Sequence, residues 1–97
     1  MQRLSFTLTN ETGLHARPAS MLVKKANSFQ ADIQIRNLTT NSTAVDAKSI
    51  LLVLTLGGEQ GHQIQIDIQG KDEAQAVQEL GALIEGGFSM EGEGEPS

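Results

Sequence analysis

The chain contains no cysteine, which excludes disulfides, thiolate metal sites and cysteine nucleophiles together. It also lacks tryptophan and tyrosine and has only 3 phenylalanines, too few for a platform on which bases or sugars stack. No apolar run approaches the roughly 20 residues that a membrane-spanning helix needs, and the first residues lack the apolar stretch of a signal peptide. We therefore expect a cytoplasmic protein without membrane insertion.

Basic side chains are scarce as well. The 7 lysines and arginines face 12 aspartates and glutamates, which gives a net charge of −5. Nucleic-acid binding needs clustered basic residues, so nucleic acid is excluded as the main partner. The length suits a single hydrophobic core. We assign residues 1–87 to one domain and residues 88–97, which hold Glu91, Glu93 and Glu95, to a flexible acidic tail.

Hydrophobic periodicity predicts seven elements in the order β-α-β-β-α-β-α. Ser49 and Asp72 stand where N-caps of the second and third helices are expected, and Gly86-Gly87 ends the last helix. The order predicts an α+β fold with a mostly antiparallel sheet and its helices on one face. The predicted strands lie around 3–9, 32–36, 44–47 and 63–69, and the predicted helices around 16–26, 50–56 and 73–85. Two layers leave no deep cleft, so we expect function on a surface.

The segment 13–18, Gly-Leu-His-Ala-Arg-Pro, carries the strongest chemical signal. It places His15 at the N-cap of the first helix, where free backbone N–H groups favour an anion. Arg17 can grip phosphate oxygens, and Pro18 is tolerated in the first turn because its missing N–H would be unpaired there. These residues predict a histidine that accepts a phosphoryl group, stabilised by helix amides and a guanidinium.

A plain alternative stays open at this point, in which His15 is a surface histidine that begins a helix and Arg17 points into solvent. A metal site has less support because the chain has only one other histidine and no acidic cluster accompanies His15 in the sequence. A hydrolytic triad also lacks support. His62 precedes a strand without a helix start or an arginine beside it, so we interpret it as a polar surface residue.

The short helix after Ser49 is apolar on two sides. On a helical wheel Leu52, Val53 and Leu56 form one face, and Ile50, Leu51 and Leu54 form the other. A helix lying on a sheet can bury only one face, so the second is either covered by the 38–43 connection or exposed for a partner. We favour a docking surface, because exposed apolar patches usually mark interactions.

The chain resembles the HPr family, the histidine-containing phosphocarriers of the bacterial phosphoenolpyruvate-dependent sugar phosphotransferase system. The resemblance covers roughly residues 2–85. It rests on Gly-Leu-His-Ala-Arg-Pro-Ala at 13–19, on Ala-Lys-Ser-Ile at 47–50, and on Leu-Gly at 56–57 before the last strand and helix. It implies an open-faced β-sandwich with a four-stranded sheet and three helices.

The resemblance also implies a function. His15 would receive phosphate on Nδ1 from enzyme I and pass it to IIA domains, while Arg17 would stabilise the transferred group and Ala16 and Pro18 would shape the helix start. The chain would then be a monomeric carrier and not an enzyme, with no metal or cofactor. The expected partner-docking residues are Ser20, Lys48, Ile50, Leu51 and Leu54.

Ser49 matches the family's regulatory serine, the target of an HPr kinase/phosphorylase. A phosphate there would add about two negative charges beside the docking face and weaken the docking of an acidic partner. A plain N-cap serine remains the alternative. Two other functions stay open: an HPr-like module of a dihydroxyacetone-kinase or nitrogen-related relay, and a regulatory module that docks a transcription factor through the Ser49 helix.

The chain departs from the family pattern in three places. The 36–46 region is longer than usual, Leu52 stands where glycine is common, and Ser20 stands where alanine is common. These departures bear on the choice of partner more than on the phosphorylation site.

Overall fold

The fold was obtained as a computed structural model, and the structure describes residues 1–88. The element order is the predicted one. The elements are β1 (Gln2–Thr7), α1 (Ala16–Asn27), β2 (Asp32–Asn37), β3 (Val45–Asp46), α2 (Ile50–Leu54), β4 (Gln63–Gln69) and α3 (Glu73–Glu85). Within residues 1–88 no helix has both the length and the apolar character needed to cross a membrane.

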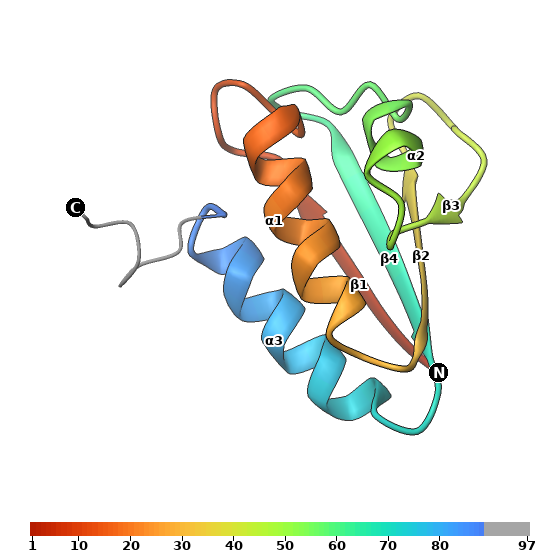
Figure 1. The fold of residues 1–97 in the computed structure, drawn as a ribbon. Coiled ribbons are helices and arrows are strands. Elements are labelled where there is room, and N and C mark those ends of the chain that lie inside the picture. The colour runs from red at the N-terminus through yellow and green to blue at the C-terminus, as the bar shows by residue number, and fades with distance from the viewer. Residues whose placement is uncertain (89–97) are drawn as a thin grey trace.

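The four strands form one sheet in the order β1-β4-β2-β3, and every neighbouring pair is antiparallel. The helices lie on one face of this sheet, and α1 lies beside both α3 and the short helix α2 (Figure 1). The predicted α+β class, with a four-stranded antiparallel open sheet and three helices, is confirmed. The pairing of β1 with β4 matters most for function, because it places the loop after β1 beside the turn before β4.

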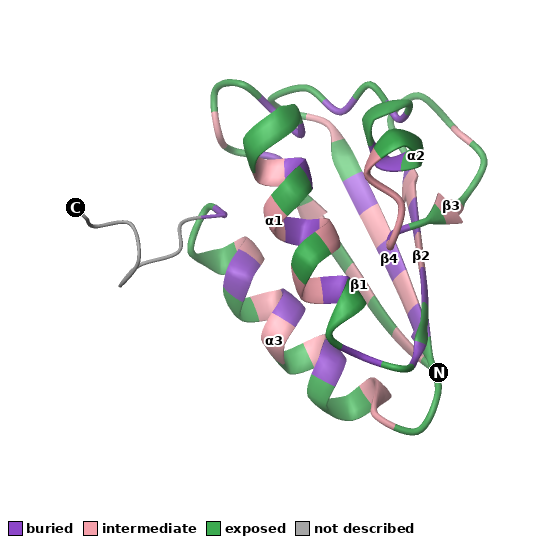
Figure 2. Cartoon of the chain, viewed as in Figure 1, coloured by how far each residue is buried: buried purple, intermediate pink, exposed green. Residues whose placement is uncertain are grey.

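The core lies between the sheet and the helices (Figure 2). Alternate residues of the two central strands point into it, so Ile33 faces Ile68 and Ile35 faces Ile66 across the β2–β4 pair. Leu22 of α1 and Leu80 of α3 belong to the same core cluster as these isoleucines and are fully buried. The period-two and helical patterns of the sequence therefore describe the real buried faces.

The prediction that Leu52, Val53 and Leu56 share one face of α2 is wrong. Val53 and Leu56 are buried, but Leu52 is 40% exposed. The helix ends at Leu54, and the bonds from Leu56 N to Val53 O and from Thr55 N to Leu52 O, both 3.1 Å, span three residues instead of four. This tighter winding places Leu56 above Val53 and turns Leu52 away from the core.

Asp72 occupies the N-cap position of α3 as predicted, but its side chain makes no capping bond. Its carboxylate accepts instead from the backbone N–H of Gln30 at 2.8 Å and of Ala31 at 2.9 Å, and so ties α3 to the segment before β2. The hydrogen bond from Gln30, together with the one from Ala31, lowers the pKa of Asp72 below its ordinary value.

Phe88, which the sequence analysis places in the tail, belongs to the packed core and is only 6% exposed. Its ring lies 6.4 Å from that of Phe6, and its N–H bonds the carbonyl of Leu83 at 2.9 Å. An apolar aromatic ring next to the end of α3 is buried more favourably than it is solvated. The remainder of the predicted tail, residues 89–97, lies outside the described residues.

Candidate functional site

His15 stands at the N-cap of α1 with an exposed side chain. Its backbone is extended, with φ −90° and ψ −160°, and its carbonyl accepts the first helical bond from Ala19 N at 2.9 Å. Its imidazole makes no capping bond to the helix, unlike a typical N-cap side chain. The ring is therefore available to an incoming group.

The first turn of α1 offers two free donors beside this ring. The N–H groups of Ala16 and Arg17 have no partner in the part of the chain that the structure describes. Pro18, which is half-buried, has no N–H to offer. Free amides and the positive end of the helix dipole favour an anion at this point.

Arg17 lies on the same turn and is exposed. Among residues 1–88 its guanidinium forms neither an ion pair nor a hydrogen bond, and only its carbonyl is engaged, by the Ser20 hydroxyl at 3.1 Å. A guanidinium without an internal partner can turn toward a phosphate that arrives at the helix start.

The loop before His15 is held in one conformation. Gly13 has φ +65°, and a Cβ at this position would lie 2.4 Å from the carbonyl oxygen of Gly58. The Asn10 side chain donates to the Gly13 carbonyl at 2.6 Å, and the buried Leu14 donates its N–H to the Gly58 carbonyl at 3.0 Å. Only glycine allows both this backbone angle and this close approach.

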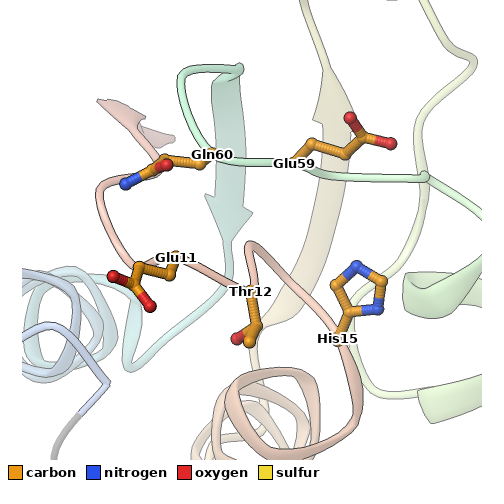
Figure 3. Close-up of a pocket in the computed structure, with 5 residues that line it drawn as sticks. All are labelled: Glu11, Thr12, His15, Glu59 and Gln60. Atoms are coloured by element: carbon orange, nitrogen blue, oxygen red, sulfur yellow. The ribbon is translucent and has the colours of Figure 1, made fainter.

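A cavity of about 460 Å³ opens beside the helix start. The His15 ring points from the beginning of α1 toward the segment that carries Glu59 (Figure 3). Neither Arg17 nor any α2 side chain lines the cavity. The lining residues are Glu11, Thr12, His15, Glu59 and Gln60.

Two of these lining residues are acidic. Glu11 stands close to His15 in the sequence, whereas Glu59 is far from it in the chain. Glu59 reaches the cavity because β1 pairs with β4, a long-range arrangement that local periodicity does not reveal. Within the described residues, no group of three or more histidines and carboxylates is placed to hold a metal ion.

A family model described as "PTS HPr component phosphorylation site" matches residues 3–86. The chain belongs to the HPr family. The motif-based resemblance is thereby confirmed, and the fold described above is that of an HPr phosphocarrier domain.

Relatives and solved structures agree with this assignment. A multiphosphoryl transfer protein of Haemophilus influenzae is 42% identical over 84 residues, which are 87% of this chain and 17% of that protein. HPr-C-His from Thermoanaerobacter tengcongensis has a TM-score of 0.84 and 35% identity, with 100% of both chains covered. An HPr dimer from the same organism has a TM-score of 0.70 and 36% identity, with 92% and 99% covered. The chain spans about a fifth of the length of the curated relatives that it matches, between 17% and 22%.

The predicted docking residues of this HPr domain differ in their surroundings. Leu51 is 74% exposed and Leu54 40%, whereas Ile50 is half-buried against the core. Ser20 is exposed on α1. Lys48 is engaged within the molecule, since its Nζ donates to the Phe29 carbonyl at 2.8 Å. The lysine thus ties the segment before α2 to the end of α1.

Ser49 caps α2, as the sequence predicts. Its Oγ accepts from the N–H of Leu52 at 3.3 Å, and the residue is half-buried. The N-cap interpretation is confirmed, while a regulatory role stays a prediction.

His62 is not the plain surface residue that the sequence suggests. It is half-buried, and its Nδ1 lies 3.0 Å from the side-chain nitrogen of Asn37 and 3.3 Å from the backbone nitrogen of Glu59. Local periodicity does not predict the contact with Asn37, which reaches the ring through tertiary structure, while Glu59 belongs to the same turn as His62.

Proposed function

We propose that this HPr domain carries a phosphoryl group on Nδ1 of His15. The observation that supports this most directly is an exposed imidazole at the start of α1 that caps nothing and stands beside two free amides. Surface position suits a carrier, because a donor and an acceptor must each reach the same atom in turn.

In the proposed transfer, the lone pair of the neutral Nδ1 attacks the phosphorus of a phosphohistidine on enzyme I. The new N–P bond forms as the donor N–P bond breaks, and that electron pair returns to the donor ring. Transfer from His15 to a IIA domain repeats the same exchange. The N–H groups of Ala16 and Arg17 and the Arg17 guanidinium would stabilise charge on the phosphoryl oxygens.

The two carboxylates near His15 limit how firmly the group is held. Glu11 and Glu59 line the same cavity, and their negative charge opposes a phosphoryl dianion while the helix amides favour it. A balance of this kind suits a carrier, which must release the phosphoryl group as readily as it accepts it. Positioning and electrostatics would suffice, and the proposal needs no cofactor and no catalytic activity of the chain's own.

The exposed leucines of α2 give the proposed partners a place to dock. Leu51 and Leu54 are exposed on α2, which packs against α1 (Figure 1), and Ser20 is exposed on α1 itself. We place enzyme I and IIA domains on this surface, in the cytoplasm, with the chain acting as a monomer. Apolar side chains on an open surface favour association with a partner.

We further propose that phosphorylation of Ser49 by an HPr kinase/phosphorylase regulates this docking. The Ser49 hydroxyl lies at the start of α2, next to the exposed leucines. A phosphate there would bring about two negative charges to the edge of the docking surface. An acidic partner would then bind less tightly.

Labelling with ³²P from phosphoenolpyruvate in the presence of enzyme I tests the proposed acceptor. We expect the natural chain to be labelled, His15→Ala to lose the label completely, and His62→Asn to keep it. The second variant is a matched control, because it removes the other of the 2 histidines in the chain.

Labelling of His15→Ala at the level of the natural chain would refute the choice of His15. A natural chain that enzyme I cannot label, but that another phosphohistidine donor can, would assign it to a different relay.

A further inference from the structure

A buried asparagine at the end of β2 has an unambiguous side-chain orientation. Asn37 is fully buried, and its Oδ1 accepts from the backbone N–H groups of Thr39 at 3.0 Å and Thr40 at 3.2 Å. Both are obligatory donors, so the other end of the amide must be its NH₂. That NH₂ donates to the carbonyl of Leu56 at 3.2 Å and points at Nδ1 of His62 at 3.0 Å.

The orientation of Asn37 in turn decides the tautomer of His62. A second donor, the backbone N–H of Glu59, reaches the same Nδ1 at 3.3 Å. A nitrogen that faces two donors acts as the acceptor and carries no hydrogen, so the proton of the neutral ring lies on Nε2. His62 is therefore held by its neighbours in one tautomer.

The peptide bond between Gly58 and Glu59 connects this histidine to the other one. Its N–H donates to His62, and its C=O accepts from the N–H of Leu14 at 3.0 Å. In a planar trans peptide these two groups point in opposite directions, so fixing one fixes the other. Leu14 directly precedes His15, and the Glu59 side chain lines the cavity beside the His15 ring (Figure 3).

We propose that His62 is a positioning residue for His15. Its Nδ1, oriented by Asn37, holds the Gly58–Glu59 peptide plane, and this plane holds Leu14 and the cavity rim at the start of α1. The effect on phosphoryl transfer rests on the proposed function of His15, whereas the hydrogen-bond chain itself does not.

Nuclear magnetic resonance tests the chain of bonds without any partner protein. At about pH 8, where an ordinary histidine is neutral, the ¹⁵N shifts of His62 in the natural protein should show a proton on Nε2 and none on Nδ1. Hydrogen exchange at the amides of Glu59 and Leu14 should be slow. A proton on Nδ1 would overturn the proposal.

Two variants of His62 separate positioning from simple filling of space. His62→Leu keeps a side chain of similar bulk but removes the acceptor, and should speed exchange at Glu59 and Leu14 about tenfold. His62→Asn places an oxygen near the position of Nδ1 and should restore slow exchange. The Ile66 amide in the middle of β4 serves as an internal reference for overall stability.

Transfer kinetics then connect the hydrogen bonds to the site. With phosphorylated enzyme I, His62→Leu should lower the transfer rate at saturating concentration about fivefold with little change in KM, and His62→Asn should recover it. Equal rates in the three proteins, or equal exchange at Glu59 and Leu14 relative to Ile66, would overturn the proposed positioning role. If no protein is labelled at all, the acceptor role of His15 fails while the exchange data still decide the role of His62.

Discussion

The two histidines of the chain differ in what their rings contact. His15 presents an exposed imidazole that makes no capping bond, and free amides stand beside it. The ring of His62 is half-buried, and its Nδ1 faces the side chain of Asn37 and the N–H of Glu59. A ring whose nitrogen already faces internal donors is suited to hold structure, whereas a ring free of such contacts is suited to react.

The comparison also shows that the two histidines are not independent. The Gly58–Glu59 peptide contacts His62 on one side and Leu14 on the other, so the engaged ring supports the segment that presents the free one. Variants around each histidine should therefore differ in their effect on folding and on transfer.

Asn37→Asp should have the largest effect, because it disrupts the contacts that hold the His62 ring. The substitution replaces the buried NH₂ with an oxygen that faces two acceptors, the Leu56 carbonyl and Nδ1 of His62. We expect a loss of about 3 kcal/mol in the free energy of unfolding at neutral pH, measured by urea denaturation. Asn41→Asp, in an exposed position with φ +59°, is the control and should change stability very little. Equal losses in the two variants would mean that the Asn37 contacts are unimportant.

Gly13→Ala should disturb the loop that leads into His15. The new Cβ would overlap the Gly58 carbonyl at 2.4 Å, in a backbone conformation that alanine rarely adopts. We expect a loss of about 2 kcal/mol in the free energy of unfolding, together with slower phosphoryl transfer.

Gly57→Ala is the matched control for this clash. Gly57 has a similar φ of +59°, but nothing lies within 4 Å of a Cβ built there. Gly57→Ala should lower the free energy of unfolding by only about 1 kcal/mol, because it introduces the backbone strain without the steric overlap. If both variants lose the same amount, the contact between Gly13 and Gly58 does not matter for stability.

The smallest expected effect concerns Asp72, which contacts neither histidine. Its pKa is lowered by the hydrogen bond from Gln30 and then by that from Ala31, so its carboxylate stabilises the fold above the ordinary aspartate pKa. This contribution is lost as the pH falls below the ordinary aspartate pKa and through the lowered one. In Asp72→Asn, the free energy of unfolding measured by urea denaturation should fall less steeply with decreasing pH in this range. In Asp32→Asn it should fall as steeply as in the natural protein. If Asp72→Asn lost stability at low pH as steeply as the natural protein, the hydrogen bonds to Asp72 would not be the cause of this pH dependence.

Local patterns predicted most of the fold. Alternation identified the strands that contain Ile33 and Ile64, and the change of period at Ala16 identified the start of α1. Ser49 was correctly placed as a cap. These features depend on residues a few positions apart, which is why the sequence reveals them.

Apart from the face of α2 that carries Leu52, the features that sequence analysis missed depend on residues far apart in the chain. Glu59 reaches the cavity beside His15 only because β1 pairs with β4, and Asp72 leaves its cap position to bond the segment before β2. Lys48 bonds the Phe29 carbonyl, and Phe88 packs near Phe6. No periodicity encodes such contacts, so they had to come from the three-dimensional arrangement.

The strand order has a consequence for folding during synthesis on the ribosome. Within residues 1–88, β1 is an edge strand that pairs with β4 alone, and the turn that fixes Leu14 precedes β4. A nascent chain that has exposed the 13–18 motif but not yet residues 58–69 therefore lacks the support of that motif. The contact between Leu14 and Gly58 closes a long loop, which is entropically costly and comes late in folding. His15, the proposed acceptor, thus gains its structural support only after the chain has been synthesised through β4.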